Sequence, residues 1–105
     1  MAIQYATAEN FDALVANGVV IADFYSTTCN PCKLLARFLE DLVADMPFVE
    51  VVKVNTTDYP ALKERFDIRA VPTVHFYKDG ELRETHLGLM SPDELRQQLG
   101  ALLYE

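Results

Sequence analysis

The sequence lacks tryptophan and has few basic side chains, few glycines and only two cysteines among its 105 residues. The 9 lysines and arginines stand against 16 aspartates and glutamates, and the formal charge of -7 disfavours nucleic acid and anionic membrane surfaces as partners. Two cysteines cannot provide the several disulfides that hold a small secreted scaffold together. With 4 glycines and 5 prolines, the composition is neither that of a disordered chain nor that of a repetitive one.

Long hydrophobic runs are also missing. No apolar run reaches the length needed to span a bilayer, and residues 1–6 do not show the basic cluster and apolar run of a secretory signal. We therefore expect a cytoplasmic protein. Half of the residues are apolar and the chain length suits one compact core, so we predict a single domain over residues 1–105 that acts as a monomer.

Strand and helix patterns alternate along the chain. After a short apolar start, strands are predicted at residues 19–25, 48–54, 73–78 and 82–87. Helices are predicted at 8–16 after the cap Thr7, from the cysteines to residue 46, at 60–66, and after a capping box at Ser91. Asp79-Gly80 favours a tight hairpin between the last two strands. This order predicts an α/β fold whose mixed central sheet, parallel strands plus a C-terminal antiparallel hairpin, is flanked by helices on both faces.

The two cysteines lie three residues apart, at the first turn of the second predicted helix. Residues at this spacing share a helix face, with α-carbons roughly 5 to 6 Å apart, which suits a disulfide. Unpaired backbone N–H groups and the helix dipole favour a thiolate at Cys29, which is the predicted nucleophile. Cys32 lies further in and is predicted to resolve the mixed disulfide that Cys29 forms with a substrate. The intervening Asn30 and Pro31 are predicted to tune the reduction potential.

Other readings of these polar residues remain. The cysteine pair could be structural, although its place at a helix start after a buried strand argues against this. A Cys2His2 zinc site does not fit, because the spacings to His75 and His86 match no ordinary zinc finger, and both histidines are predicted to be ordinary sheet residues. Asp23 is out of place in an apolar strand, since a buried carboxylate without partners is costly or has a raised pKa.

Several short motifs follow one another along the chain: Asp23-Phe24, Cys29-Asn30-Pro31-Cys32-Lys33, Lys53-Val54-Asn55, Val71-Pro72-Thr73, Lys78-Asp79-Gly80 and Gly88. With them the sequence resembles the thioredoxin family over essentially the whole chain. Such motifs in the right order are far more specific than one Cys-x-x-Cys pair. The resemblance implies a thioredoxin fold and thiol–disulfide exchange with disulfide-containing protein substrates. It also implies an electron donor similar to thioredoxin reductase, and no cofactor beyond the redox-active Cys29-Cys32 disulfide.

The resemblance further implies how substrate is bound. Pro72 is implied to follow a cis peptide bond beside the cysteines, although an ordinary trans proline at the start of a strand is the alternative. The backbone of Val71 is implied to pair with the substrate polypeptide, and Gly88 to let that polypeptide approach closely.

A proton acceptor is implied as well. In thioredoxins the acid that matches Asp23 accepts a proton from the resolving cysteine, directly or through water, and a lysine that matches Lys53 lies nearby and tunes the site. A purely structural ion pair between Asp23 and Lys53 is the alternative.

Three positions depart from the family pattern. Thr28 stands where family members usually carry Trp before the first cysteine, and Asn30 stands where Gly is common. Arg37 replaces a proline that commonly kinks the active-site helix. These departures leave the sulfur chemistry intact and bear on the choice of partner and on the reduction potential.

A cytoplasmic protein-disulfide reductase is the leading hypothesis. A disulfide oxidant or isomerase would differ in reduction potential. A non-catalytic binding module on the same fold is the alternative from another class.

Overall fold

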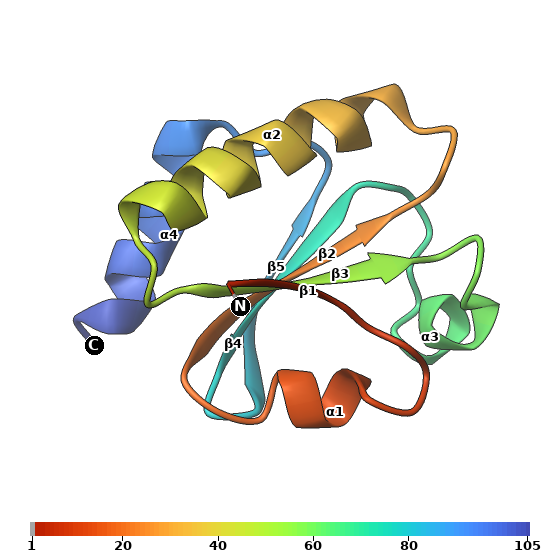
Figure 1. Ribbon diagram of the computed structural model, residues 1–105, viewed down its shortest axis with the longest axis horizontal. Coiled ribbons are helices and arrows are strands. Elements are labelled where there is room, and N and C mark those ends of the chain that lie inside the picture. Colours follow the sequence, from red (N-terminus) through yellow and green to blue (C-terminus); the bar gives the residue numbers. More distant parts are fainter. Residues whose placement is uncertain (1) are drawn as a thin grey trace.

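The computed structural model describes residues 2–105, and Figure 1 shows a central sheet with helices on both sides. The strands are β1 (Ile3–Tyr5), β2 (Val19–Tyr25), β3 (Glu50–Asn55), β4 (Thr73–Lys78) and β5 (Glu81–Leu87). The helices are α1 (Phe11–Leu14), α2 (Asn30–Asp45), α3 (Pro60–Arg65) and α4 (Pro92–Leu103). Within the described residues, no helix combines the length and the apolar character that a membrane crossing requires.

The five strands follow the order β1-β3-β2-β4-β5 in one sheet. β1, β3 and β2 run parallel, whereas β4 is antiparallel to β2, and β5 is antiparallel to β4. Asp79 and Gly80 close the β4–β5 hairpin with φ angles of 51° and 85°, the left-handed geometry that a tight hairpin turn needs. The predicted mixed sheet with a C-terminal hairpin is therefore confirmed.

The central strand β2 separates two hydrophobic clusters. Because side chains alternate along a strand, Ile21 points to the face covered by α2 and α4, and Val20 and Phe24 point to the face that carries α1 and α3. Asp23 has the same parity as Ile21. Its carboxylate therefore belongs to the face beneath α2, which is the helix that begins at the cysteines.

Two local expectations were wrong. The first helix starts at Phe11 and not at residue 8, because Thr7 and Asn10 exchange hydrogen bonds: Thr7 N–H donates to Asn10 Oδ1 at 2.6 Å, and Asn10 N–H donates to Thr7 Oγ1 at 3.2 Å. Thr7 still caps the turn that leads into α1. The second strand was expected to begin at residue 48, but β3 begins only at Glu50, so Phe48 lies in the preceding loop and is 62% exposed.

Candidate active site

The cysteines lie where the chain leaves β2 and enters α2. Cys29 is the N-cap of α2, with the extended backbone (φ -93°, ψ 112°) usual for a cap, and Pro31 occupies one of the first helical positions. The Cys29 side chain accepts a hydrogen bond from Cys32 N–H, with an N–Sγ distance of 3.2 Å. This amide is one of those that a helix leaves unpaired at its start. The cap sulfur therefore lies where backbone N–H groups stabilise negative charge.

Cys29 and Cys32 form a disulfide, with α-carbons 5.3 Å apart. The sequence spacing predicted this separation. The two residues differ in accessibility, because Cys29 is partly exposed and Cys32 is only 3% exposed. A protein substrate can therefore reach the outer sulfur, while the inner one is shielded by α2 and the sheet.

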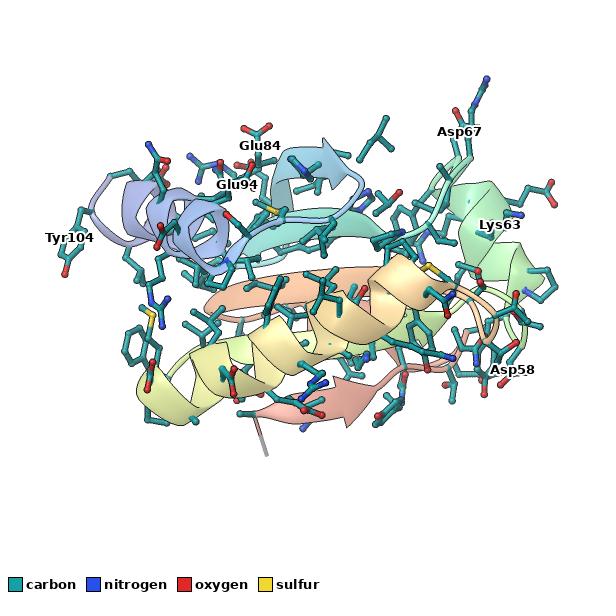
Figure 2. All side chains as sticks on the ribbon, turned by 90° about the horizontal axis from the view of Figure 1, so that it is seen from above. Asp58, Lys63, Asp67, Glu84, Glu94 and Tyr104 are labelled. Carbon is teal, nitrogen blue, oxygen red and sulfur yellow. A yellow bond between two sulfur atoms is a disulfide. The ribbon has the colours of Figure 1, made fainter. Side chains whose placement is uncertain are left out.

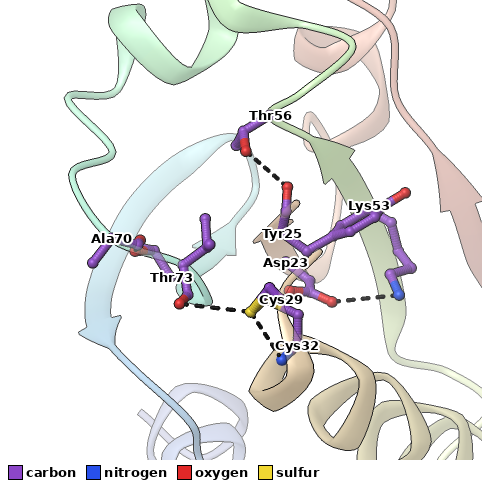
Figure 3. The surroundings of a disulfide bond; sticks show 9 residues. Asp23, Tyr25, Cys29, Cys32, Lys53, Thr56, Ala70 and Thr73 are labelled. Atoms are coloured by element: carbon purple, nitrogen blue, oxygen red, sulfur yellow. Dashed lines mark hydrogen bonds and ion pairs between the residues drawn. A yellow bond between two sulfur atoms is a disulfide. The ribbon is translucent and has the colours of Figure 1, made fainter. Parts of the chain in front are cut away.

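Asp23 lies in the interior, on the face of β2 that is covered by the helix carrying the cysteines. It is fully buried, and it is paired in register with Lys53 on the neighbouring strand β3. Lys53 Nζ lies 3.6 Å from Asp23 Oδ2, which is an ion-pair distance too long for a good hydrogen bond. Neither carboxylate oxygen has a hydrogen-bond partner among residues 2–105. Figure 3 shows Asp23 with Lys53 on one side and the cysteines on the other.

Burial decides the protonation of this carboxylate. Removal from water raises the pKa of Asp23 to about 6, and the positive charge of Lys53 opposes this rise without cancelling it. Asp23 is therefore poised to exchange a proton close to neutral pH.

Cys32 and Lys53 also line one small pocket of about 190 Å³, together with Tyr25 and its neighbours. The ammonium of Lys53 lies 4.7 Å from the centre of the Tyr25 ring, a cation–π contact that holds the lysine at the pocket. The pocket opens to solvent, so water can reach the walls that Cys32 and Lys53 form.

The loop before β4 forms the other wall of the site. The Val71–Pro72 peptide bond is cis, as the resemblance implied. Val71 O lies 3.7 Å from Cys29 Sγ, and Thr73 Oγ1 donates to Ala70 O at 2.6 Å, which fixes the loop. Among residues 2–105, nothing accepts a hydrogen bond from Val71 N–H. The Val71 backbone is thus beside the reactive sulfur and has a donor to spare.

Gly88 follows β5 and lies next to this loop, because its N–H donates to Pro72 O at 2.8 Å. Its φ of +90° is in the region that favours glycine. A Cβ built there would meet nothing within 4 Å, so the space above Gly88 is open.

The remaining predicted residues divide into two groups. Asn30, Thr28 and Arg37 are exposed around the site, and α2 is uninterrupted past Arg37. His75 is buried in β4 against the Phe24 ring, and burial lowers its pKa to about 4, so it is the sheet residue that we predicted. Among the described residues, no group of three or more His, Cys, Asp or Glu side chains is placed to hold a metal ion.

Sequence reasoning missed some of the surroundings of the site. The pocket lined by Lys63, Arg69 and Val71 comes together only through the tertiary fold, and no periodicity or spacing could have indicated it.

Comparison with known proteins agrees with this geometry. A sequence model described as Thioredoxin matches residues 2–101. The thioredoxin of Chlamydia caviae is 38% identical over 93 residues, covering 89% of this chain and 91% of that protein. The thioredoxin of Bacillus subtilis is 37% identical over 100 residues, and that of Staphylococcus haemolyticus 33% over 100 residues; each comparison covers 94% of this chain, and 95% and 96% of the relatives. The chain therefore belongs to the thioredoxin family of thiol–disulfide oxidoreductases.

Proposed function

We propose that this protein reduces disulfides in other proteins, with Cys29 as the attacking sulfur and Cys32 as the resolving one. The asymmetry of the pair carries this proposal. Cys29 is partly exposed and caps α2, where Cys32 N–H donates to its sulfur, whereas Cys32 is buried. A thiolate is the attacking species in disulfide exchange, and these surroundings favour it at Cys29.

The reaction has two exchanges. The Cys29 thiolate attacks one sulfur of the substrate disulfide, whose S–S bond breaks and releases a substrate thiolate, while a mixed disulfide forms. Cys32 then loses its proton and attacks Cys29 Sγ. This step breaks the mixed disulfide, releases the second substrate sulfur as a thiolate that takes up a proton, and leaves the Cys29–Cys32 disulfide. Two electrons have passed to the substrate.

Asp23 is the proposed acceptor of the Cys32 proton. It is buried on the α2 face of the sheet, its pKa is raised to about 6, and its partner Lys53 lines the same pocket as Cys32. A water in this pocket can relay the proton between the buried thiol and the carboxylate. Lys53 keeps the pKa of Asp23 lower than burial alone would make it.

Substrate is proposed to bind as an extended strand along Val71. The free N–H of Val71, its carbonyl beside Cys29, the cis bond to Pro72 and the open space at Gly88 support this placement. We further propose that the protein works as a cytoplasmic monomer of one domain, and that a reductase of the thioredoxin-reductase type returns the disulfide to the dithiol. No other cofactor enters the cycle.

Insulin reduction with dithiothreitol tests the proposal. The wild type is expected to accelerate precipitation of the insulin B chain. Cys29→Ser is expected to abolish the acceleration, and Cys32→Ser to accumulate mixed disulfide. Equal rates for the wild type and Cys29→Ser would show that the fold serves only as a binding module.

A further inference from the structure

A second pocket lies at the substrate-binding edge of the site and has a different character. It measures about 240 Å³, and its walls include Ser26, Thr57, Lys63, Arg69 and Val71. Val71 is shared with the reactive centre, since its carbonyl lies 3.7 Å from Cys29 Sγ. A substrate strand that pairs with Val71 therefore passes the mouth of this pocket.

Positive charge distinguishes this pocket within an acidic protein. The whole chain carries a formal charge of -7, yet two of its 9 lysines and arginines line this one pocket. Lys63, exposed on α3, forms no ion pair within residues 2–105. Figure 2 shows Lys63 at the same end of the molecule as Asp58 and Asp67, away from Tyr104.

One acidic neighbour offsets part of this charge. Asp67 forms an ion pair with Arg69, with its two carboxylate oxygens 3.1 and 3.2 Å from Nε. The two terminal nitrogens of the guanidinium still have N–H groups to donate, and Lys63 supplies the charge that no ion pair offsets within residues 2–105. Asp58 is exposed and uses its backbone N–H to bond Asn55. The hydroxyl groups of Ser26 and Thr57 add hydrogen-bond donors that an anion can use.

We infer that this pocket is a specificity subsite for an acidic side chain of the substrate, within about two residues of the attacked cysteine. The inference rests on the proposed function, because the substrate strand must lie along Val71. An extended chain advances about 3.3 Å per residue, so the side chain that enters a pocket bordered by Val71 belongs to a near neighbour of the reacting cysteine. A carboxylate there meets Lys63 and Arg69, and a lysine there is repelled.

Equilibrium competition tests the subsite without requiring turnover. The Cys32→Ser variant is equilibrated with two single-cysteine peptides and their disulfides. The two peptides are identical except that one has Glu and the other Gln at a single position. The experiment is repeated for each of the four positions within two residues of the cysteine. The Cys29 thiolate exchanges with either disulfide and releases one peptide thiolate each time. Mass spectrometry then gives the ratio of the two mixed disulfides.

The Glu peptide is expected to be enriched about threefold to fivefold at one of the four positions, the range for an exposed charge pair, and less so at high salt. Adding Lys63→Glu is expected to reverse the preference. Adding Arg96→Glu makes the same charge change far from the site and is expected to leave the ratio unchanged. All variants are measured with the same two peptides, so intrinsic differences between the peptide thiols cancel when the ratios of two variants are compared.

A ratio that is equal at all four positions, or that Lys63→Glu and Arg96→Glu shift alike, would overturn the subsite. Catalytic reduction of the Gln peptide by the wild type is measured separately. Activity without a charge preference would reject the subsite and keep the proposed function. No activity together with a preference that depends on Lys63 would keep the subsite and reject the proposed function.

Discussion

At the scale of single residues, Asp23 is the side chain whose surroundings differ most from water. Its raised pKa means that the folded protein binds a proton more tightly than the unfolded chain between pH 3.8 and about 6. Stability from this group is therefore lost as the pH rises through that window, and the charged carboxylate is a net cost at neutral pH.

Asp23→Asn is expected to raise the free energy of unfolding at pH 7 to 8 by about 1 to 3 kcal/mol, since a shift of about two pKa units corresponds to roughly that amount. Urea titration measures the change. The matched control is Asp41→Asn on α2, which is expected to stay within about 0.5 kcal/mol of the wild type. Loss of stability in Asp23→Asn would show that the ion pair with Lys53 outweighs burial.

The same variant is expected to release substrate more slowly. Without a carboxylate, Cys32 loses the acceptor proposed for its proton, so decay of the mixed disulfide near pH 7 is expected to slow by about 100-fold, the low end of general acid–base catalysis. Rapid mixing with a fluorescent disulfide peptide measures it in single turnover. An unchanged rate from pH 6 to 8 would leave Asp23 with a structural role only.

Lys53→Met is expected to raise the pKa of Asp23 further, because it removes the one charge that opposes burial. The carboxyl resonance of Asp23, followed by NMR against pH, reports this directly. A midpoint that falls or stays the same would mean that Lys53 does not act on Asp23 through its charge.

At the scale of elements, helices α2 and α4 both begin at a residue whose side chain accepts a hydrogen bond from a backbone N–H of the first turn, but the accepting atoms differ. Ser91 Oγ caps α4 by accepting a hydrogen bond from Glu94 N–H, and Ser91 N–H donates to Glu94 Oε1 in return. Cys29 caps α2 with a sulfur. The first cap serves stability, whereas the second places a reactive atom among backbone donors.

Ser91→Ala is expected to lower the free energy of unfolding by about 1 kcal/mol, since the cap hydrogen bond is lost. Disulfide reduction by the variant is expected to be unchanged, because Ser91 lines neither of the two pockets beside the cysteines. Thermal unfolding and insulin reduction, each compared with the wild type, measure the two effects. A stability loss below about 0.3 kcal/mol would mean that water replaces the cap fully.

Strand β4 carries a second buried titratable group. Burial lowers the pKa of His75 to about 4, so the unfolded chain binds the extra proton between pH 4 and 6.5, and stability rises with pH there. Asp23 gives the opposite slope over nearly the same window. The two slopes largely cancel in the wild type.

Unfolding of Asp23→Asn is therefore expected to show the His75 slope alone, a rise of up to about 1.4 kcal/mol per pH unit between pH 4 and 6. His75→Phe is expected to show a fall with pH over that range. Denaturant melts at several pH values measure both. Parallel pH profiles for all three proteins would contradict the opposing assignments.

At the scale of the whole molecule, much of the fold could be predicted from the sequence. The apolar runs indicated strands β2 and β4, and Asp79-Gly80 indicated the β4–β5 hairpin, because each of these patterns is local in the sequence. The predicted starts of the first helix at residue 8 and of the second strand at residue 48 were wrong. The hydrogen bonds between Thr7 and Asn10, and the point where β3 begins, depend on local geometry that periodicity does not report.

The site was predictable in its chemistry and less so in its surroundings. Cys29 and Cys32 stand out because they lie three residues apart at a predicted helix start. Asp23 stands out because it is a carboxylate within an apolar strand. The approach of Val71 to Cys29, and of Lys63 and Arg69 to Val71, joins segments far apart in sequence, and only the tertiary fold shows it.

Redox titration addresses the direction of the reaction. Equilibration with dithiothreitol and glutathione buffers is expected to give a potential toward the reducing end of the known span, about -270 mV, as for a reductase. A value near -120 mV would identify an oxidant.

The unequal ionisation of the two sulfurs is tested most directly by alkylation of the reduced protein across pH, followed at each cysteine by mass spectrometry. Cys29 is expected to react with a midpoint clearly below the ordinary thiol value of about 8.5, and Cys32 at least about 10 times more slowly at pH 7. Equal, slow alkylation of both thiols at neutral pH would contradict the account.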